Sequence, residues 1–98
     1  MTLVVISPRA LSDLIDITTY LDTAAGFAVA YRYEQRIRYK IERLAEFPGL
    51  GTPRPRLGPH VRLLVERPYL IYYQWDERVE VLRILDGRRL ITRKLIRG

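Results

Sequence analysis

The sequence lacks cysteine, has a single histidine and contains no long hydrophobic run. Without cysteine no disulfide bond can form, which is compatible with a reducing compartment. The longest uncharged stretch, residues 23–31, has nine residues, whereas a bilayer-spanning helix needs roughly 20. The first six residues hold only a short apolar run without a basic flank, unlike a secretory signal. We therefore expect a cytoplasmic protein that does not enter a membrane.

The length of the chain limits it to one domain. Domains usually have about 100 to 150 residues, so residues 1–98 could not build a second core. Apolar residues make up 48% of the chain, which is enough for one modest core without metal or disulfide support. We expect a single domain over residues 1–98, with no cofactor and no metal site.

Acidic residues are scarce in two parts of the chain, and the net charge is +6. Residues 1–47 are neutral, residues 48–62 hold three arginines and no acidic residue, and residues 78–98 hold seven basic residues against two acidic ones. Such a positive field attracts acidic protein surfaces or nucleic acid. Fifteen of the 17 basic residues are arginine, whose planar group recognises carboxylate and phosphate, although a base-composition bias of the genome would give the same excess.

The first half of the sequence predicts one strand and two helices. Residues 3–6 form a continuous apolar run, typical of a strand buried on both faces. Ser7 and Pro8 then predict a helix start, because serine caps a helix and proline fits its first turn. A second helix is predicted over residues 28–47, before Pro48 and Gly49. The apolar positions at helical spacing are Leu11, Leu14, Ile15, Thr18 and Leu21 in the first helix, and Ala30, Tyr33, Ile37, Ile41 and Leu44 in the second.

The second half predicts a loop, three strands and a basic tail. Residues 48–60 contain four prolines and three glycines and fit neither periodicity. The apolar runs at 61–66, 69–75 and 78–85 are separated by short turns, which favours antiparallel pairing. Residues 88–98 are either a short helix or an extended segment. In the last strand, one face should carry Glu80, Leu82 and Ile84, and the other Val79, Val81, Arg83 and Leu85.

The predicted order is β-α-α-β-β-β, which is an α+β fold. A helical hairpin packed on one face of a curled, mainly antiparallel sheet would bury the apolar positions of both helices. The other face of the sheet would then stay available for another macromolecule.

Three segments together resemble the ParE/RelE superfamily of toxins over nearly the whole chain. They are VVISPRALSDLIDITTYL, YRYEQRIRYKIERLAEFPGLGTPRP and VRLLVERPYLIYYQWDERVEVLRILDGRR. The resemblance implies the toxin of a type II toxin-antitoxin system, neutralised by a cognate antitoxin protein that wraps around it. The positive field and exposed apolar flanks would complement a disordered, acidic antitoxin segment that folds on binding.

Two mechanisms occur on this fold, and the fold does not choose between them. Relatives of the RelE type cleave mRNA in the ribosome, which requires proton transfer and stabilisation of phosphorane charge. Relatives of the ParE type poison DNA gyrase, which requires binding and no chemistry. If the chain is a nuclease, its catalytic residues would be Arg62, Arg83 and Asp86. Because Asp86 stands where histidine is often found, and an ordinary aspartate with a pKa of about 3.9 is a poor general acid at pH 7, we favour gyrase.

The candidate binding residues fall into two groups. Candidates for target contact are Arg54, Arg56, Arg62, Arg83, Arg88 and Arg89. For Arg62 and Arg83 the alternative role is an ion pair with an acidic side chain over the sheet. Candidates for antitoxin contact are Tyr31, Tyr39 and Trp75, and Tyr39 should lie opposite the core side of its helix. His60 is expected to be a solvated loop residue, and a non-enzymatic nucleic-acid-binding module is a third possible function.

Overall fold

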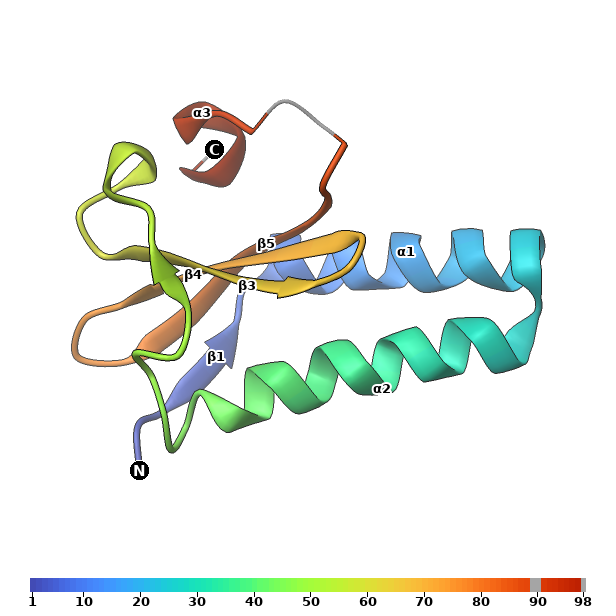
Figure 1. The fold of residues 1–98 in the computed structure, drawn as a ribbon, viewed down its shortest axis with the longest axis horizontal. Helices are drawn as coiled ribbons and strands as arrows, with labels where there is room; N and C mark the ends of the chain where they lie inside the picture. Colours follow the sequence, from blue (N-terminus) through green and yellow to red (C-terminus); the bar gives the residue numbers. More distant parts are fainter. Residues whose placement is uncertain (89–90, 98) are drawn as a thin grey trace.

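Two helices form a hairpin on one face of a mixed β-sheet (Figure 1). The structure, a computed structural model, describes residues 1–88 and 91–97. Within these residues the sheet has five strands in the order β1-β5-β4-β3-β2. All pairs are antiparallel except β1 with β5, so the predicted α+β fold and mainly antiparallel sheet are confirmed. The strands are β1 (Val4–Ile6), β2 (Thr52–Pro53), β3 (Val61–Glu66), β4 (Tyr69–Trp75) and β5 (Val79–Asp86).

The hairpin consists of α1 (Pro8–Ala25) and α2 (Phe27–Arg43). The predicted start of α1 is confirmed, because the Ser7 hydroxyl accepts a hydrogen bond from the Ala10 amide at 3.1 Å. Gly26 joins the helices with a φ of 94°, a conformation that glycine adopts without a clash from Cβ. α2 ends at Arg43, before the predicted residue 47, because the amides of Leu44, Ala45 and Glu46 bond to carbonyls three residues back and tighten the chain into turns. Among the described residues, no helix has the length and apolar character of a membrane span.

The core side of α2 was predicted correctly, and that of α1 only in part. Ala30, Ile37, Ile41 and Leu44 are buried as expected, and Tyr33 packs against them. On α1, Leu14 and Leu21 pack in the core, but Leu11 and Ile15 are 42% and 56% exposed. Ala10 and Ile17 take their place. Ala10 is fully buried, and its small side chain allows α1 to lie close to β5. The side of α1 that contains Ala10 therefore faces the sheet, instead of the side predicted from Leu11 and Ile15.

The strand β1 lies at one edge of the sheet. Its three residues are each only partly buried. The prediction of a strand buried on both faces was therefore wrong, because Val4 and Ile6 pack against the core at its margin and stay partly exposed.

A β-bulge in β5 changes which of its residues share a face. Tyr72 pairs with Arg83 but Tyr73 pairs with Val81, so Leu82 is an extra residue on β5. Val79, Val81 and Ile84 consequently all join the core beneath the helices, while Leu82 and Leu85 face the other side. The predicted strict alternation was wrong, because one inserted residue moves every later side chain to the opposite face.

The second face of the sheet is covered by the chain itself. The C-terminal helix α3 (Arg93–Arg97) lies on the side of the sheet opposite α2 (Figure 1), and the short 3₁₀ helix η1 (Pro55–Leu57) lies beside it. This corrects the prediction that this face stays available to another macromolecule. In α3 the apolar residues Leu95 and Ile96 stand between basic ones, and the burial of these two side chains on the apolar sheet face is favourable. The buried residues of this second core are Val61, Leu63, Tyr72, Leu85 and Ile96.

Candidate functional site

Arg83 is buried, with 8% of its surface exposed, and it links three elements of the fold. Its Nε and Nη2 atoms donate to the carboxylate of Asp13 on α1 at 2.8 and 2.9 Å. Its Nη1 atom donates to the carbonyl of Leu95 on α3 at 2.8 Å. Hydrogen bonding to Asp13 raises the pKa of Arg83, so the guanidinium stays charged. The structure therefore shows the alternative ion-pair role for Arg83, and its contact with a target stays a prediction.

Asp86 at the end of β5 is paired with Arg88. The Nη2 and Nε atoms of Arg88 donate to its carboxylate at 2.6 and 3.0 Å, and the Arg88 amide donates at 2.9 Å. These hydrogen bonds from Arg88 lower the pKa of Asp86 to about 2. A carboxyl group that is protonated only in strong acid cannot serve as a general acid at neutral pH.

Arg62 on β3 is fixed beside the only tryptophan of the chain. Its Nη1 atom donates to the carbonyl oxygens of Gly49 and Gly51, at 3.1 and 2.7 Å. Its guanidinium carbon lies 5.5 Å from the ring centroid of Trp75 on β4, a cation–π distance. Arg62 therefore holds the loop after α2 against the sheet, and the ion-pair role expected for it is not observed among the described residues.

Tyr73 fixes the same loop from within the core. Its hydroxyl accepts a hydrogen bond from the Gly51 amide and donates one to the Pro48 carbonyl, both at 2.8 Å. Burial raises the pKa of Tyr73, so its hydroxyl keeps the proton that it donates. A Cβ atom at position 51 would lie 2.7 Å from the Tyr73 ring, which explains why glycine stands there.

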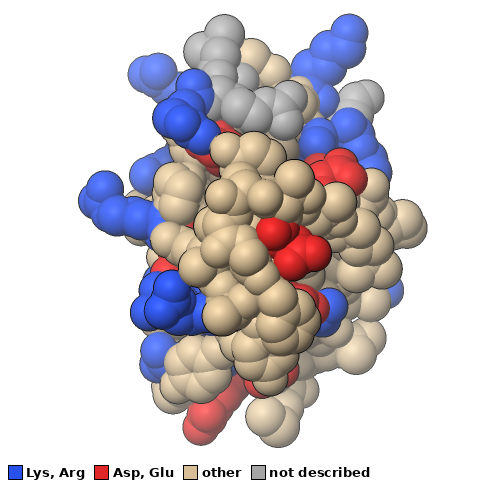
Figure 2. All heavy atoms as spheres, turned by 90° about the vertical axis from the view of Figure 1, so that its right-hand side faces the viewer, with Lys and Arg blue, Asp and Glu red and all other residues tan. Residues whose placement is uncertain are grey.

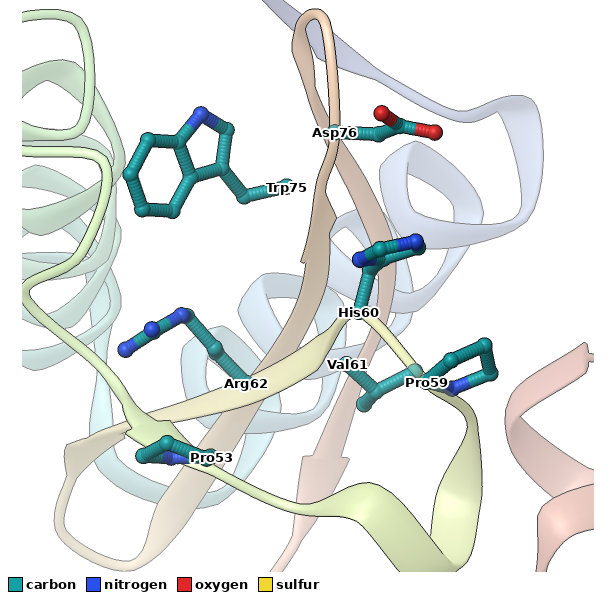
Figure 3. Close-up of a pocket in the computed structure, with 7 residues that line it drawn as sticks. All are labelled: Pro53, Pro59, His60, Val61, Arg62, Trp75 and Asp76. Atoms are coloured by element: carbon teal, nitrogen blue, oxygen red, sulfur yellow. The ribbon is translucent and has the colours of Figure 1, made fainter.

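A pocket of about 360 Å³ lies at this end of the sheet (Figure 3). The indole of Trp75 and the imidazole of His60 lie on opposite sides of the space in this view, with the guanidinium of Arg62 below the indole. Its other lining residues are Pro53, Pro59, Val61 and Asp76. Sequence reasoning assigned Arg62 and Trp75 to different partners and left His60 aside, because neither periodicity nor composition places these three together.

The remaining target candidates divide between two ends of the sheet. Arg54 and Arg56 are exposed in the segment after β2, where Pro53 pairs with Arg62. Arg88 follows the end of β5 that pairs with Tyr69, at the far end of β4 from Trp75. Pro53, the residue before Arg54, thus lies beside Arg62, whereas Arg88 lies at the other end of the sheet. Arg89 lies outside the described residues.

Two of the three antitoxin candidates lie on the outer side of α2. Tyr31 and Tyr39 are 53% and 61% exposed, so Tyr39 does lie opposite the core as predicted. The ring of Tyr31 stacks on Phe27 with 5.9 Å between centroids. The guanidinium of Arg43 lies 5.9 Å from the Tyr39 ring. Trp75, the third candidate, does not lie on α2 but on β4, beside Arg62.

Phe27 is an exposed aromatic residue that sequence reasoning missed. It is 73% exposed, and with Tyr31 it lines a groove of about 280 Å³ between the two helices. The end of the molecule around the hairpin tip is largely uncharged, with a few acidic groups in its middle and basic side chains toward one side and the top (Figure 2). The four-residue spacing of Phe27 and Tyr31 was the available signal, because residues so spaced are neighbours on a helix surface.

Comparison with known proteins identifies the family. Residues 4–91 match the family described as "ParE toxin of type II toxin-antitoxin system, parDE". Toxin ParE1 of Caulobacter vibrioides is 35% identical over 80 residues, which cover 82% of this chain and 83% of that protein. Toxin ParE3 of the same organism is 38% identical over 71 residues, 71% of each chain. The solved structure "Chromosomal ParDE TA system from P. aeruginosa" superposes with a TM-score of 0.76 at 26% identity, covering 88% of this chain and 96% of that one. The chain therefore belongs to the ParE toxin family of type II toxin-antitoxin systems.

Proposed function

We propose that this toxin inhibits DNA gyrase by binding to it, without catalysing a reaction, and that a cognate antitoxin neutralises it. The observation that carries the proposal is the state of the groups that a nuclease would need. Arg83 is hydrogen-bonded to Asp13, and the hydrogen bonds from Arg88 keep Asp86 ionised. Membership of the ParE family, rather than of a nuclease branch, supports the same choice.

The alternative, cleavage of mRNA in the ribosome, requires a group that protonates the leaving oxygen. Among the three residues considered for it, only Asp86 could carry a transferable proton, and its low pKa argues against that role. Arg83 already donates three of its five N–H groups to Asp13 and Leu95, and only 8% of its surface is exposed, so a phosphorane has little access to it. Freeing it from Asp13 would break a buried ion pair, which costs about 3–5 kcal/mol.

We propose that Arg54, Arg56 and Arg62 form the main target-binding group, with Arg88 and Arg89 as a second one. The first three are grouped because Pro53, which precedes Arg54, pairs with Arg62, and Arg56 is exposed two residues after Arg54. Residues 47–65 contain no acidic side chain, so no neighbour along the chain offsets their charge. Their positive field would attract an acidic protein surface or DNA.

We propose that the outer side of α2 binds the antitoxin. Tyr39 is exposed there beside Arg43, the stacked rings of Phe27 and Tyr31 lie at the groove toward α1, and Arg32 is exposed on the same helix. Exposed rings next to cations suit an amphipathic acidic segment that folds on the toxin, because its apolar side chains meet the rings and its carboxylates meet the arginines. Trp75 is a less direct candidate, since Arg62 already lies over its ring.

The target is tested by adding purified toxin to gyrase and supercoiled DNA and measuring cleaved DNA trapped with the enzyme. We expect trapped cleavage to rise with toxin and to fall strongly for the double variant Arg54→Glu with Arg56→Glu. Arg67→Glu is the matched control, because Arg67 is also an exposed arginine in a turn but lies between β3 and β4. Full gyrase activity under saturating toxin would exclude the proposal, and mRNA cuts in a translation extract would favour the nuclease.

A further inference from the structure

His60, Arg62 and Trp75 are set side by side by the pairing of β3 with β4. Val61 pairs with Gln74, and the Trp75 amide donates to the His60 carbonyl at 3.0 Å, so His60 and Trp75 are direct neighbours across the strands. Side chains opposite each other in an antiparallel pair leave the same face. His60 and Arg62 are two residues apart, so their side chains share that face as well.

The geometry leaves one side of the Arg62 guanidinium free for a ligand. Its Nη1 atom is used by the carbonyls of Gly49 and Gly51. Among the residues that the structure describes, its Nε and Nη2 atoms make no hydrogen bond. The guanidinium is therefore held in place and still has the two parallel donors that match a phosphate group.

The pocket around these residues has the size and the walls of a small-molecule site. Its volume of about 360 Å³ lies at the low end of the roughly 300–1,000 Å³ typical of ligand pockets. The rings of Trp75 and His60 supply flat surfaces, and Pro53 and Pro59 supply rigid ones (Figure 3). Asp76 is the one carboxylate among the lining residues, so a run of phosphates through the pocket would be repelled there.

We infer that this pocket binds one nucleotide of a single-stranded nucleic acid. The base contacts the rings of Trp75 and His60, and its phosphate binds the free side of Arg62. An acidic peptide would satisfy the arginine but not the rings, whereas a nucleotide uses both. The inference does not depend on the target of the toxin, because the pocket is formed by this chain alone.

Trp75 provides the measurement, because it is the only tryptophan and lines the pocket. Titration of the toxin with a short oligothymidylate should change its fluorescence in a saturable way. The affinity should fall with salt, by a log–log slope of about −0.7 per phosphate bound. An oligoglutamate of equal charge, at the same ionic strength, should produce a much smaller change.

Two variants separate the pocket from general attraction by charge. His60→Ala removes an exposed side chain but keeps the carbonyl that pairs with Trp75, so the fold should be unaffected. We expect it to weaken binding about fivefold or more, as for loss of a stacked base. Trp75→Leu, followed with a labelled oligonucleotide because the reporter is lost, should weaken binding at least as much. The exposed control Arg67→Gln should change affinity less than twofold, since one distant charge contributes little.

Three results would overturn the inference. They are no saturable change in fluorescence, equal binding of oligoglutamate and oligonucleotide, and affinities that His60→Ala and Trp75→Leu both leave intact. Circular dichroism of each variant distinguishes these results from misfolding. The gyrase assay is run separately on the same His60→Ala protein, so a failure of either proposal is recognised independently.

Discussion

Asp13 on α1 accepts two hydrogen bonds from Arg83 on β5, at 2.8 and 2.9 Å, although 70 residues separate the two in the chain. The same carboxylate accepts the Ile84 amide at 3.0 Å. The side chains of Asp13 and Arg83 are only 13% and 9% exposed. The bond is therefore shielded from water and connects the hairpin to the strand that also carries α3.

Removal of one partner of this pair should destabilise the protein strongly. We expect Asp13→Asn to lower the free energy of unfolding by about 3–5 kcal/mol, because Arg83 would stay buried without a counter-charge. The measurement is urea unfolding followed by circular dichroism. Glu34→Gln, which weakens the partly exposed i,i+4 pair with Arg38, is the control and should cost only about 0.3–0.5 kcal/mol. A cost for Asp13→Asn as small as that of the control would contradict the assigned role of Arg83.

The Asp86–Arg88 pair predicts a specific pH dependence. The pKa of Asp86 is lowered from 3.8 to about 2, so this group favours the folded state at any pH above 3.8. Its contribution should decline as the pH falls from 3.8 toward 2, because the unfolded chain then binds the proton first. A carbon-detected NMR titration of the Asp86 carboxyl group measures this directly. In Arg88→Gln the midpoint should return toward 3.8, and an unchanged midpoint would mean that Arg88 is not the cause.

Two glycines of the loop after α2 allow a matched test of close packing. A Cβ at position 51 would lie 2.7 Å from the Tyr73 ring and 2.9 Å from the Leu63 carbonyl, while one at position 49 would lie 3.4 Å from Trp75. We expect Gly51→Ala to cost about 1–3 kcal/mol, because neither the buried ring nor the strand can move away easily. Gly49→Ala should have little effect on urea unfolding. Equal stability of the two variants would argue against the packing of this loop.

Coverage of the second sheet face by α3 is tested at Ile96, which is 2% exposed. Ile96→Ala should lower the free energy of unfolding by about 2–5 kcal/mol or, if α3 detaches alone, expose β3 amides to hydrogen exchange. Lys94→Ala, on the exposed side of the same helix, should change neither measurement. If the Ile96→Ala variant had the same hydrogen exchange and the same free energy of unfolding as the wild type, α3 would not pack on the sheet.

The proposed antitoxin surface predicts which tyrosine matters. Tyr39→Ala and Tyr31→Ala should each weaken antitoxin binding about tenfold, because exposed aromatic residues dominate interfaces of this kind. Tyr20→Ala is matched for exposure, at 63% against 61% for Tyr39, but lies on α1. Calorimetric titration with the cognate antitoxin should show no change for it. If Tyr20→Ala were the damaging variant, the antitoxin would bind the other side of the hairpin.

Local sequence signals predicted the elements well where the residues that decide them are close in the chain. Ser7 and Pro8 define the start of α1 because capping involves only the next three residues. The bounds of β3 and β4 follow from dense apolar runs between turn residues. The core side of α2 follows from its helical periodicity.

The candidate site was predicted less well, because its residues meet only through strand pairing. Nothing around Leu82 indicated a bulge, since a bulge depends on the register with β4. His60 and Trp75 lie 15 residues apart and become neighbours only when β3 and β4 pair. The sequence supplied the residue types, but not which of them share a face.

By itself the sequence determined the α+β class, the helical hairpin, the three long strands and the excess of arginine, since propensity, periodicity and charge are properties of neighbouring residues. The tertiary structure decided how those arginines are used. Arg83 is buried by an acid 70 residues away, Arg62 lies against Trp75, and the tail covers the sheet face that had been expected to stay open. Each outcome depends on long-range contacts, in which burial and pairing of distant groups outweigh local preference.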